Sequence, residues 1–304
     1  MLPVRRCGLY KIKHMELKEL ENVATAVRRD IVRMVAGVNS GHPGGSLGCA
    51  DLLVALYFDV MRRKKDPDGN PVFEMDGRDE DLFFLSNGHI SPVFYSVLAR
   101  AGYFPLGELA TFRKLNSRLQ GHPATAEHIP GVRIASGSLG QGLSVANGAA
   151  FAKKLNGDDK HVYVLMGDGE QQEGQVWEAA QFAPNKKLGN LTAIIDFNGA
   201  QIDGTTDGVN DNRDLGAKYR AFGWFVDEMQ GNDMADVIRT LKKSRETEAS
   251  DRPDVPTLIL MHTQMGFGVD YMVGSYKWHG VAPNAEQLES ALNQLVLVEG
   301  SADY

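Results

Sequence analysis

The sequence has few cysteines, no long apolar run and no excess of basic residues. Two cysteines in 304 residues, Cys7 and Cys49, are too few for a disulfide framework and are typical of a protein in a reducing compartment. No apolar run approaches the ~18 residues that span a bilayer, and the basic start of the chain lacks the apolar core of a signal peptide. These absences predict a cytoplasmic protein that does not cross a membrane.

The charge of the chain argues against two further kinds of partner. Asp and Glu outnumber Lys and Arg by 39 to 32, which gives a formal net charge of −7 at pH 7. Nucleic acids and anionic membranes favour a basic surface, so neither is an expected partner. The main basic run, residues 62–65, is followed closely by Asp66 and Asp68 and is interpreted as a solvated turn. The chain does have 43% hydrophobic residues, which is enough for a sizeable core.

Hydrophobic periodicity predicts an alternation of helices and short strands. Apolar residues recur every three or four positions from Glu16 to Ala36, which indicates an amphipathic helix ended by Gly37. Short, continuously apolar runs indicate buried strands over residues 82–85, 161–166, 191–197, 224–229 and 257–262. Further helices are expected over residues 50–61, 91–102, 140–155, 174–183, a segment ending at 222, 234–245 and 285–297, with residues 39–48 as a loop.

This order of elements predicts the fold class. Short apolar strands separated by helices are typical of an α/β fold, a mostly parallel sheet flanked by helices on both faces. We therefore expect one domain over residues 16–304 after an N-terminal tail of residues 1–15. In such a sheet, ligands bind beyond the carboxyl ends of the strands.

The stretch GDG places Asp168 between Gly167 and Gly169, directly after a predicted strand. The next predicted strand is followed at once by Asn198, so the carboxylate and the amide meet at the ligand-binding edge if the two strands are neighbours. Their oxygens suit Mg²⁺ or Ca²⁺, and the glycines let backbone N–H groups approach a diphosphate. The alternative is local, with Asp168 as a helix cap and Asn198 in a turn with Gly199. For GDG alone, the local interpretation is favoured.

Four of the eight histidines adjoin a glycine: His42, His89, His122 and His279. Their glycine and proline neighbours predict loops rather than the interior of helices or strands. Imidazole exchanges protons near pH 7, so four histidines in similar loops indicate proton transfer or ligand binding. Any one of them alone would be interpreted as a polar loop residue.

The stretch SGSLGQG faintly resembles a dinucleotide-binding loop, with Asp158 and Asp159 about 20 residues further on. However, no predicted strand precedes Gly137, and the two aspartates lie in the turn NGDDK rather than at the end of a strand. The nicotinamide interpretation is therefore rejected.

Taken together, the motifs of this chain resemble those of transketolases. GDG, 28 intervening residues and then Asn198 form the thiamine-diphosphate motif of that family. The matching stretches run in family order from about residue 38 to 280: VNSGHPGGSLG, LSNGH, GHP, SGSLGQGLSVANG, GDGEQQEG, DFNGAQIDG and a late HG. The resemblance covers the diphosphate-binding domain of the usual single-chain enzyme and implies the thiamine-diphosphate-binding fold. With Ser138 in place of the usual proline, the chain looks like the N-terminal subunit of a two-chain transketolase.

The resemblance implies a site for thiamine diphosphate and for Mg²⁺ or Ca²⁺. It assigns the metal to the side chains of Asp168 and Asn198 and to the main-chain carbonyl of Ala200. Ile202 would pack on the thiazolium ring of the cofactor. The implied cofactor-binding residues are His89, Gly137, Leu139, Gly167, Gly169, Asn198, Ile202 and His279.

The resemblance also implies a reaction, the transfer of a two-carbon ketol unit from a ketose phosphate to an aldose phosphate, as in the pentose phosphate pathway. The implied catalytic residues are His42 and His122, which would face the hydroxyls of the sugar, and His279, near both substrate and diphosphate. Glu173 resembles a family glutamate at the contact between subunits. An exposed glutamate in the first turn of a helix is an equally good interpretation of that residue.

Finally, the resemblance implies a partner. The glutamate that meets the aminopyrimidine ring of the cofactor belongs to a pyrimidine-binding domain, which has no counterpart in this sequence. A C-terminal transketolase subunit that carries the domain is therefore expected, in an α₂β₂ assembly, and the small-residue helix at 144–152 is a candidate contact surface. Two alternatives stay open, the α chain of a thiamine-diphosphate-dependent 2-oxoacid dehydrogenase and a non-catalytic partner that kept the fold. The sequence does not name the sugar pair.

Overall fold

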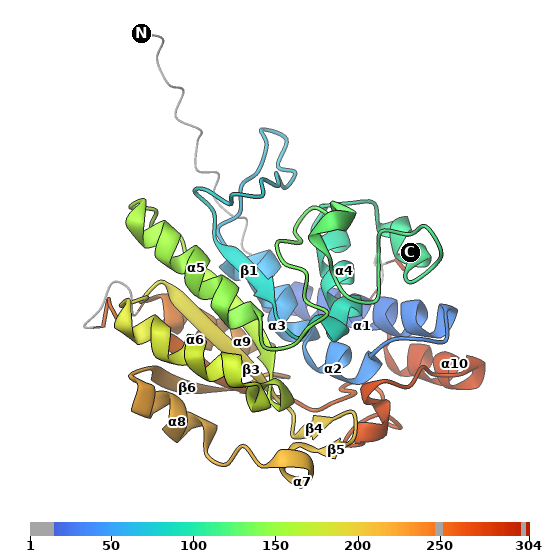
Figure 1. Cartoon of the computed structure of the whole chain (residues 1–304). Coiled ribbons are helices and arrows are strands. Elements are labelled where there is room, and N and C mark those ends of the chain that lie inside the picture. The colour runs from blue at the N-terminus through green and yellow to red at the C-terminus, as the bar shows by residue number, and fades with distance from the viewer. Residues whose placement is uncertain (1–14, 247–251, 299–301) are drawn as a thin grey trace.

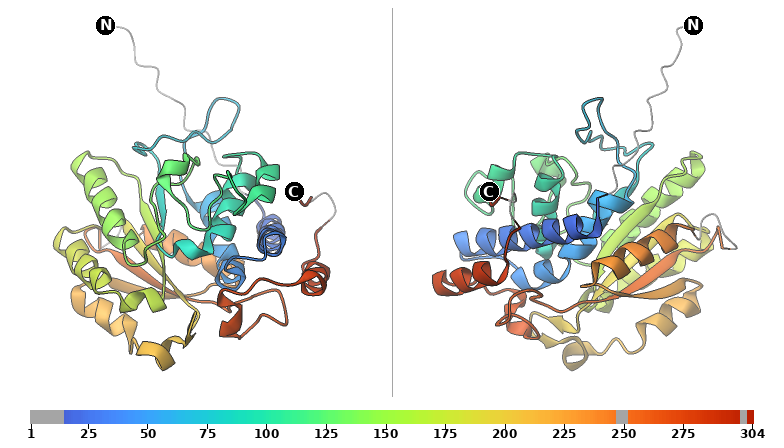
Figure 2. Two further views of the ribbon diagram at one scale, coloured as in Figure 1. Left: turned by 45° about the vertical axis from the view of Figure 1, so that its right-hand side comes forward. Right: turned by 180° about the vertical axis from the view of Figure 1, so that it is seen from behind.

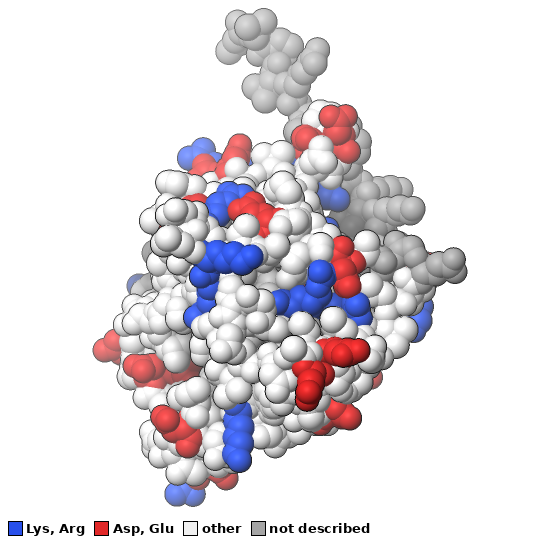
Figure 3. Space-filling view, turned by 90° about the vertical axis from the view of Figure 1, so that its right-hand side faces the viewer, with Lys and Arg blue, Asp and Glu red and all other residues white. Residues whose placement is uncertain are grey.

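A computed structural model of the chain describes residues 15–246, 252–298 and 302–304. The predicted tail therefore lies outside the described residues except at Met15, and Cys7 lies outside them too. Cys49 is buried as a free thiol. No helix in the described part of the chain is both long and apolar enough to cross a membrane. On the face shown in Figure 3, basic and acidic side chains are interspersed rather than gathered into separate regions.

The centre of the molecule is a parallel sheet of five strands in the order β1-β2-β3-β7-β6. The strands span Leu82–Leu85 (β1), Val162–Gly167 (β2), Leu191–Phe197 (β3), Phe225–Gln230 (β6) and Thr257–His262 (β7). Each lies within one residue of its predicted range, because continuous apolar runs are what a strand covered on both faces requires. The predicted α/β fold class is confirmed.

Helices cover both faces of this sheet (Figures 1 and 2). Alternate residues of β2 show the division, since Tyr163 and Leu165 belong to one core cluster and Val162 and Val164 to the other. The first cluster includes α1 (Leu17–Gly37), α3 (Ala50–Ala55), α4 (Ser91–Arg100), α9 (Met234–Glu246) and α10 (Ala285–Gln294). The second includes α5 (Gly142–Leu155), α6 (Gly174–Asn185) and α8 (Leu215–Phe222). With both faces covered by helices, the ends of the strands are where ligands are expected to bind.

The main differences between the structure and the predicted elements are in four places. Part of the loop predicted at 39–48 is a short helix, α2 (Pro43–Gly48), which Pro43 begins because its fixed φ suits the first helical turn. The helix predicted over 50–61 ends at Ala55 and continues as a π-helix over Leu56–Val60. Helix α10 ends three residues earlier than predicted. A hairpin of β4 (Ala200–Gln201) and β5 (Gly204–Thr205), followed by α7 (Thr206–Asn210), was not predicted, because such short polar elements have no periodicity.

Candidate functional site

A cavity of about 400 Å³ opens at the carboxyl ends of β2 and β3. Every residue assigned a role from the sequence lines it: His42, His89, His122, Gly137, Leu139, Gly167, Asp168, Gly169, Glu173, Asn198, Ala200, Ile202 and His279. Six further lining residues were not predicted: Gly45, Asn87, Glu170, Gln172, Asp196 and Gln201. The structure thus brings the predicted residues to one place, and their individual roles remain predictions.

Asp168 lies at the end of β2, only 2% exposed. One carboxylate oxygen accepts the N–H of Gly169 at 2.7 Å, and the other accepts the N–H of Gly199 at 2.7 Å. The first of these bonds caps the short 3₁₀-helix Gly169–Gln172, so the local interpretation of GDG describes a contact that is present. This capping bond leaves acceptor sites on the Asp168 carboxylate, because an ionised carboxylate has about four lone-pair sites.

Asn198 arrives beside Asp168 because β3 is the immediate parallel neighbour of β2. Its amide nitrogen donates to Asp196 Oδ2 at 2.7 Å, and its oxygen accepts the N–H of Ala200 at 2.9 Å. Asp196 Oδ1 in turn accepts the hydroxyl of Thr263. The bond to Asp196 therefore fixes the orientation of the Asn198 side-chain amide. The amide oxygen points away from the Asp196 carboxylate.

Asp168 and Asp196 form a buried acidic pair. Burial and the charge of Asp196 raise the pKa of Asp168 to about 7, and burial raises the pKa of Asp196. Among the described residues neither carboxylate has an ion pair with Lys or Arg, and no group of three or more His, Cys, Asp or Glu could hold a metal. A cation here would be held by carboxylate, amide and carbonyl oxygens together with oxygens of a ligand or water. That donor set fits Mg²⁺ or Ca²⁺, which would also neutralise the buried charge.

The four glycine-flanked histidines form one cluster. The His42 ring centroid lies 5.1 Å from that of His89, 6.4 Å from His122 and 5.5 Å from His279, and His89 and His279 are 5.0 Å apart. His42 and His122 lie outside helices and strands, His42 directly before α2, and the 3₁₀-helices Gly88–Ile90 and Tyr276–His279 contain the other two. The cluster is therefore set by short helical turns rather than by long loops.

Burial keeps these imidazoles neutral. Burial and the neighbouring His279, Arg113 and His122 lower the pKa of His42 to about 4, and burial lowers the pKa of His89, His122 and His279. The Nδ1 atoms of His42 and His279 are buried without a hydrogen-bond partner. Neutral imidazoles with a free nitrogen can donate to, or take a proton from, a polar ligand in the cavity.

Arg113 is a cation beside this cluster that the sequence analysis missed. Its guanidinium donates to Ser40 Oγ at 3.1 Å and to the carbonyl of Gly121 at 3.4 Å, and burial lowers its pKa. Its Nε is buried without a partner, and it forms no carboxylate ion pair within the described ranges. In the sequence it is one of 32 basic residues, and only the fold brings it beside His42 and His122.

The mouth of the cavity is apolar and exposed. Ile202, in the turn of the β4–β5 hairpin, is 57% exposed, and Leu139 is also exposed. Glu173, which precedes α6, is exposed beside Gly140. The structure therefore places the residue predicted at a subunit contact on the rim of the same cavity.

Comparisons with known proteins agree with one family. A family model described as "Transketolase, thiamine diphosphate binding domain" matches residues 20–298. An apulose-4-phosphate transketolase subunit of Phocaeicola vulgatus is 40% identical, over 92% of this chain and 95% of its own length. The 6-deoxy-6-sulfo-D-fructose transketolase subunit SqwG of Clostridium sp. is 34% identical, over 91% and 96%.

Solved structures give the same result. The transketolase of Campylobacter jejuni has a TM-score of 0.80 and 32% identity, over 92% of this chain and 43% of its own. The transketolase of Leishmania mexicana has a TM-score of 0.79 and 31% identity, over 92% and 41%. The chain therefore spans less than half of these longer relatives but nearly all of the subunits that it matches.

Proposed function

The chain belongs to the transketolase family, and we propose that it supplies the diphosphate-binding half of a two-chain enzyme that transfers a two-carbon ketol unit from a ketose phosphate to an aldose phosphate. It is part of a thiamine-diphosphate-dependent transketolase. The observation that carries the proposal is the meeting of the Asp168–Asn198 pair with four histidines in one cavity. The 2-oxoacid dehydrogenase alternative is not favoured, because three relatives of about the same extent are named as subunits of transketolases.

For the metal we propose Mg²⁺, or Ca²⁺, held by the side chains of Asp168 and Asn198 and the carbonyl of Ala200. Two features support this. The raised pKa of Asp168 reflects a buried acidic pair with no compensating charge among the described residues, and Asp196 turns the Asn198 oxygen away from itself. Hard cations with a few protein oxygens and ligand phosphate oxygens are the usual arrangement for such a donor set.

For the cofactor we propose that backbone at Gly167 and Gly169, with His89 and His279, holds the diphosphate. A side chain at residue 169 would be crowded, because its Cβ would lie 3.0 Å from Gln201 Oε1. Gly137, Leu139 and Ile202 would flank the thiazolium ring. Thiamine diphosphate, when bound, supplies the electron sink that cleavage of a ketose carbon–carbon bond requires.

For the substrate we propose that His42 and His122 contact the sugar hydroxyls and move protons there. Their lowered pKa values support this, because a neutral imidazole can accept a hydroxyl proton at pH 7. The names of the relatives include apulose-4-phosphate and 6-deoxy-6-sulfo-D-fructose, so different sugars occur within the family. The donor and acceptor of this chain must therefore be found by assay.

For the assembly we propose a C-terminal subunit with a pyrimidine-binding domain, in an α₂β₂ complex in the cytoplasm. Three relatives matched over at least 95% of their own length are named as subunits, which implies a second chain in each of those enzymes. The exposed side of α5 and α6 supports docking, because Val145, Leu155 and Phe182 are exposed there and nothing lies within 4 Å of a Cβ added at Gly148. Glu173 lies at the end of this surface nearest the cavity.

The experiment is to purify the chain with proteins that bind it, identify the partner by mass spectrometry, and assay the complex with thiamine diphosphate and Mg²⁺. We expect consumption of a ketose phosphate such as xylulose 5-phosphate only when an aldose phosphate is present. Decarboxylation of pyruvate by the complex without ketol transfer would instead favour the 2-oxoacid dehydrogenase alternative.

A further inference from the structure

Glu170 is a buried carboxylate in the wall of the cavity that no role above uses. It lies in the 3₁₀-helix Gly169–Gln172 and is only 2% exposed. Its Oε1 accepts the N–H of Gly140 at 2.7 Å and the hydroxyl of Ser86. Its Oε2 accepts the N–H of Gly167 at 3.0 Å. One side chain therefore binds three segments, the ends of β1 and β2 and the stretch before α5.

The contact between these segments is tight. Ser86 Oγ accepts a further N–H, that of Gly142, at 3.0 Å. A Cβ added at Gly142 would lie 2.3 Å from the Cβ of Ser86, so no larger residue fits there. Gly140 has a φ of +84°, which lets the chain turn its N–H toward Glu170. The backbone of residues 140–142 thus packs closely against the Glu170–Ser86 pair and donates two N–H groups to it.

Burial raises the pKa of Glu170, and the hydrogen bonds from Ser86, Gly140 and Gly167 oppose that rise. No ion pair with Lys or Arg involves Glu170 within the described ranges. A buried carboxylate without a cation is costly unless hydrogen bonds compensate for its lost hydration, and bonds to an ionised acceptor are stronger than neutral ones. Strong hydrogen bonds to Glu170 therefore connect the backbone at Gly140 with the backbone at Gly167, on the two sides of the cavity.

We propose that Glu170 is a positioning residue that holds the 137–142 segment against the end of β2, so that the two walls of the thiamine-diphosphate site keep a fixed separation. Gly137 and Leu139 line one wall, and Gly167 and Asp168 line the other. This proposal rests on the proposed function, because it takes thiamine diphosphate as the ligand between the walls. Without the carboxylate, the N–H groups of Gly140 and Gly167 lose a shared acceptor and the walls can move apart.

The matched control is Glu80, which is equally buried but lies at the opposite edge of the sheet, before β1. Its carboxylate is paired with Arg133 at 2.5 Å. Glu170→Gln and Glu80→Gln are the same chemical change at equally buried sites, and both should lower the melting temperature. Only Glu170→Gln should alter the cavity, because Glu170 lies in the cavity lining and Glu80 does not.

The test compares the two variants by hydrogen–deuterium exchange of the full chain and by titration of the chain–partner complex with thiamine diphosphate and Mg²⁺. We expect Glu170→Gln to speed exchange of peptides over 137–143 by at least tenfold and to weaken cofactor binding by at least tenfold, which is about 1.4 kcal/mol. Glu80→Gln should change neither. If Glu170→Gln does not fold, Ser86→Ala, which removes one of the donors and the acceptor for Gly142, should show the same changes to a smaller degree.

Equal exchange over 137–143 in the wild type, Glu170→Gln and Ser86→Ala would overturn the positioning role. So would an unchanged cofactor affinity of Glu170→Gln in a complex whose wild type binds the cofactor. A wild-type complex that binds no thiamine diphosphate would instead contradict the proposed function, and the exchange experiment would still decide whether Glu170 holds the segment.

Discussion

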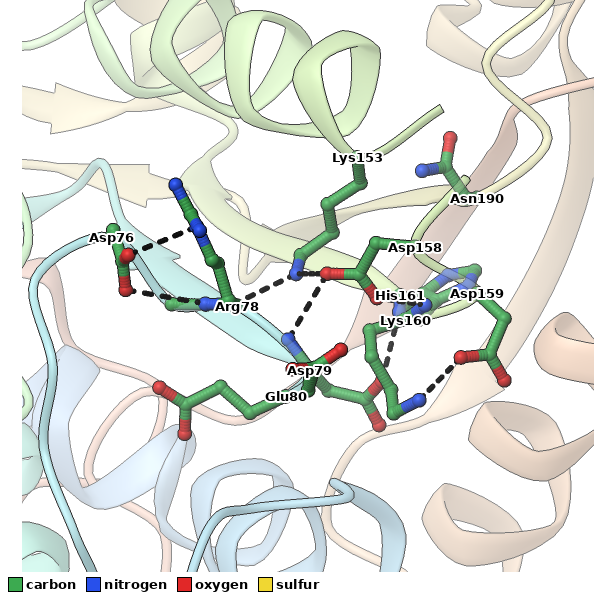
Figure 4. A network of polar contacts seen from close by, with 12 residues as sticks. Asp76, Arg78, Asp79, Glu80, Lys153, Asp158, Asp159, Lys160, His161 and Asn190 are labelled. Carbon is green, nitrogen blue, oxygen red and sulfur yellow. Dashed lines mark hydrogen bonds and ion pairs between the residues drawn. The ribbon is translucent and has the colours of Figure 1, made fainter. Parts of the chain in front are cut away.

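The two edges of the central sheet use charged residues in opposite ways. At the amino ends of the strands, several acidic side chains are paired with basic ones, among them Asp158 with Lys153 and Asp159 with Lys160 (Figure 4). Lys153 Nζ lies 2.7 Å from Asp158 Oδ2, and the Arg62 guanidinium lies 2.9 Å from Asp81. At the carboxyl ends, Asp168 has backbone donors but no cation among the described residues. The amino edge is complete in this chain, whereas the carboxyl edge leaves negative charge for a ligand to balance.

The pKa shifts of Asp158 and Asp168 show the same difference between the two edges. Burial alone would raise the pKa of Asp158, but hydrogen bonds from Lys153 and from the Lys160 backbone bring it below its ordinary value. At the other edge, burial and Asp196 raise the pKa of Asp168 to about 7. A buried charge that destabilises the unliganded chain is expected where binding, rather than folding, uses it. The following substitutions test this contrast, beginning with the largest expected effect.

Removing the metal ligands should have the largest effect. We expect Asp168→Ala and Asn198→Ala each to abolish metal-dependent binding of thiamine diphosphate while the chain stays folded, because the ion loses an oxygen that water cannot hold in place. A capping role alone would cost about 1 kcal/mol of stability and leave binding intact. Calorimetric titration of the chain–partner complex measures the affinity.

The control for this titration is Asp158→Asn at the amino edge, which should lower stability and leave cofactor affinity unchanged. If Asp168→Ala bound the cofactor as tightly as Asp158→Asn, the contrast between the two edges would be lost.

The substrate histidines should follow. We expect His42→Ala and His122→Ala to lower turnover by ~10²-fold or more, the contribution of a lost proton-transfer group, with nearly unchanged cofactor affinity. His262→Ala, a change at a partly exposed histidine on β7 that lies outside the cavity lining, is the control and should keep wild-type turnover. Steady-state kinetics at saturating thiamine diphosphate separates the two parameters. Wild-type turnover in both cavity variants would remove the histidines from the reaction.

Asp168 and Asp158 should make the stability of the metal-free chain depend on pH in different ranges and with opposite sign. Asp168 has a folded pKa of about 7 against an ordinary value of 3.8, so the folded state binds the extra proton and loses stability as pH rises from 4 to 7. The loss should be on the order of 4 kcal/mol, because a pKa difference of one corresponds to about 1.4 kcal/mol. Asp158, with its pKa lowered, should instead lose its contribution as pH falls below 3.8.

Denaturant unfolding in a chelating buffer at pH 4.5 and 7.5 measures this dependence. Asp168→Asn should flatten the stability change between these two pH values, whereas Asp158→Asn should leave it as in the wild type. An unchanged slope in Asp168→Asn would show that the Asp168 carboxyl does not carry the buried charge assigned to it.

The smallest effect is expected at the rim. Glu173→Gln should weaken association with the partner by a few-fold, because one exposed charge pair contributes roughly 0.2–1 kcal/mol. Glu289→Gln, an exposed change on α10, is the control. Sedimentation of the mixed subunits compares the two, and equal association would leave Glu173 as an ordinary exposed residue.

The sequence predicted the strands and the meeting of their ends well, for a physical reason. Runs such as residues 191–197 are apolar throughout because helices cover both faces, and in a parallel sheet neighbouring strands must end at the same edge. From that rule, Asp168 and Asn198 were expected to converge if their two strands were neighbours, and the family resemblance favoured this over the local interpretation. The histidines needed the resemblance as well, since nothing in their spacing brings residues 42, 89, 122 and 279 together.

The residues that were missed depend on charge compensation, which is a property of three-dimensional structure. Asp196 was interpreted only as part of an apolar strand, although it orients Asn198. Glu170 stood within GDGEQQEG as one more polar residue, because its donors come from Ser86 and Gly140, far away in the chain. The β4–β5 hairpin was missed for a simpler reason, since two-residue strands leave no pattern.

In our proposal the carboxyl edge is half of an active site. Titration of the purified chain with thiamine diphosphate at fixed Mg²⁺, alone and with its partner, tests this when ketol transfer is assayed in both samples. We predict weak cofactor binding and background activity for the chain alone. The partner should tighten binding by at least ~10-fold, about 1.4 kcal/mol, and raise activity at the same time, because both depend on closing the exposed mouth beside Ile202. Equal affinity in the two samples, with substantial ketol transfer by the isolated chain, would contradict the account.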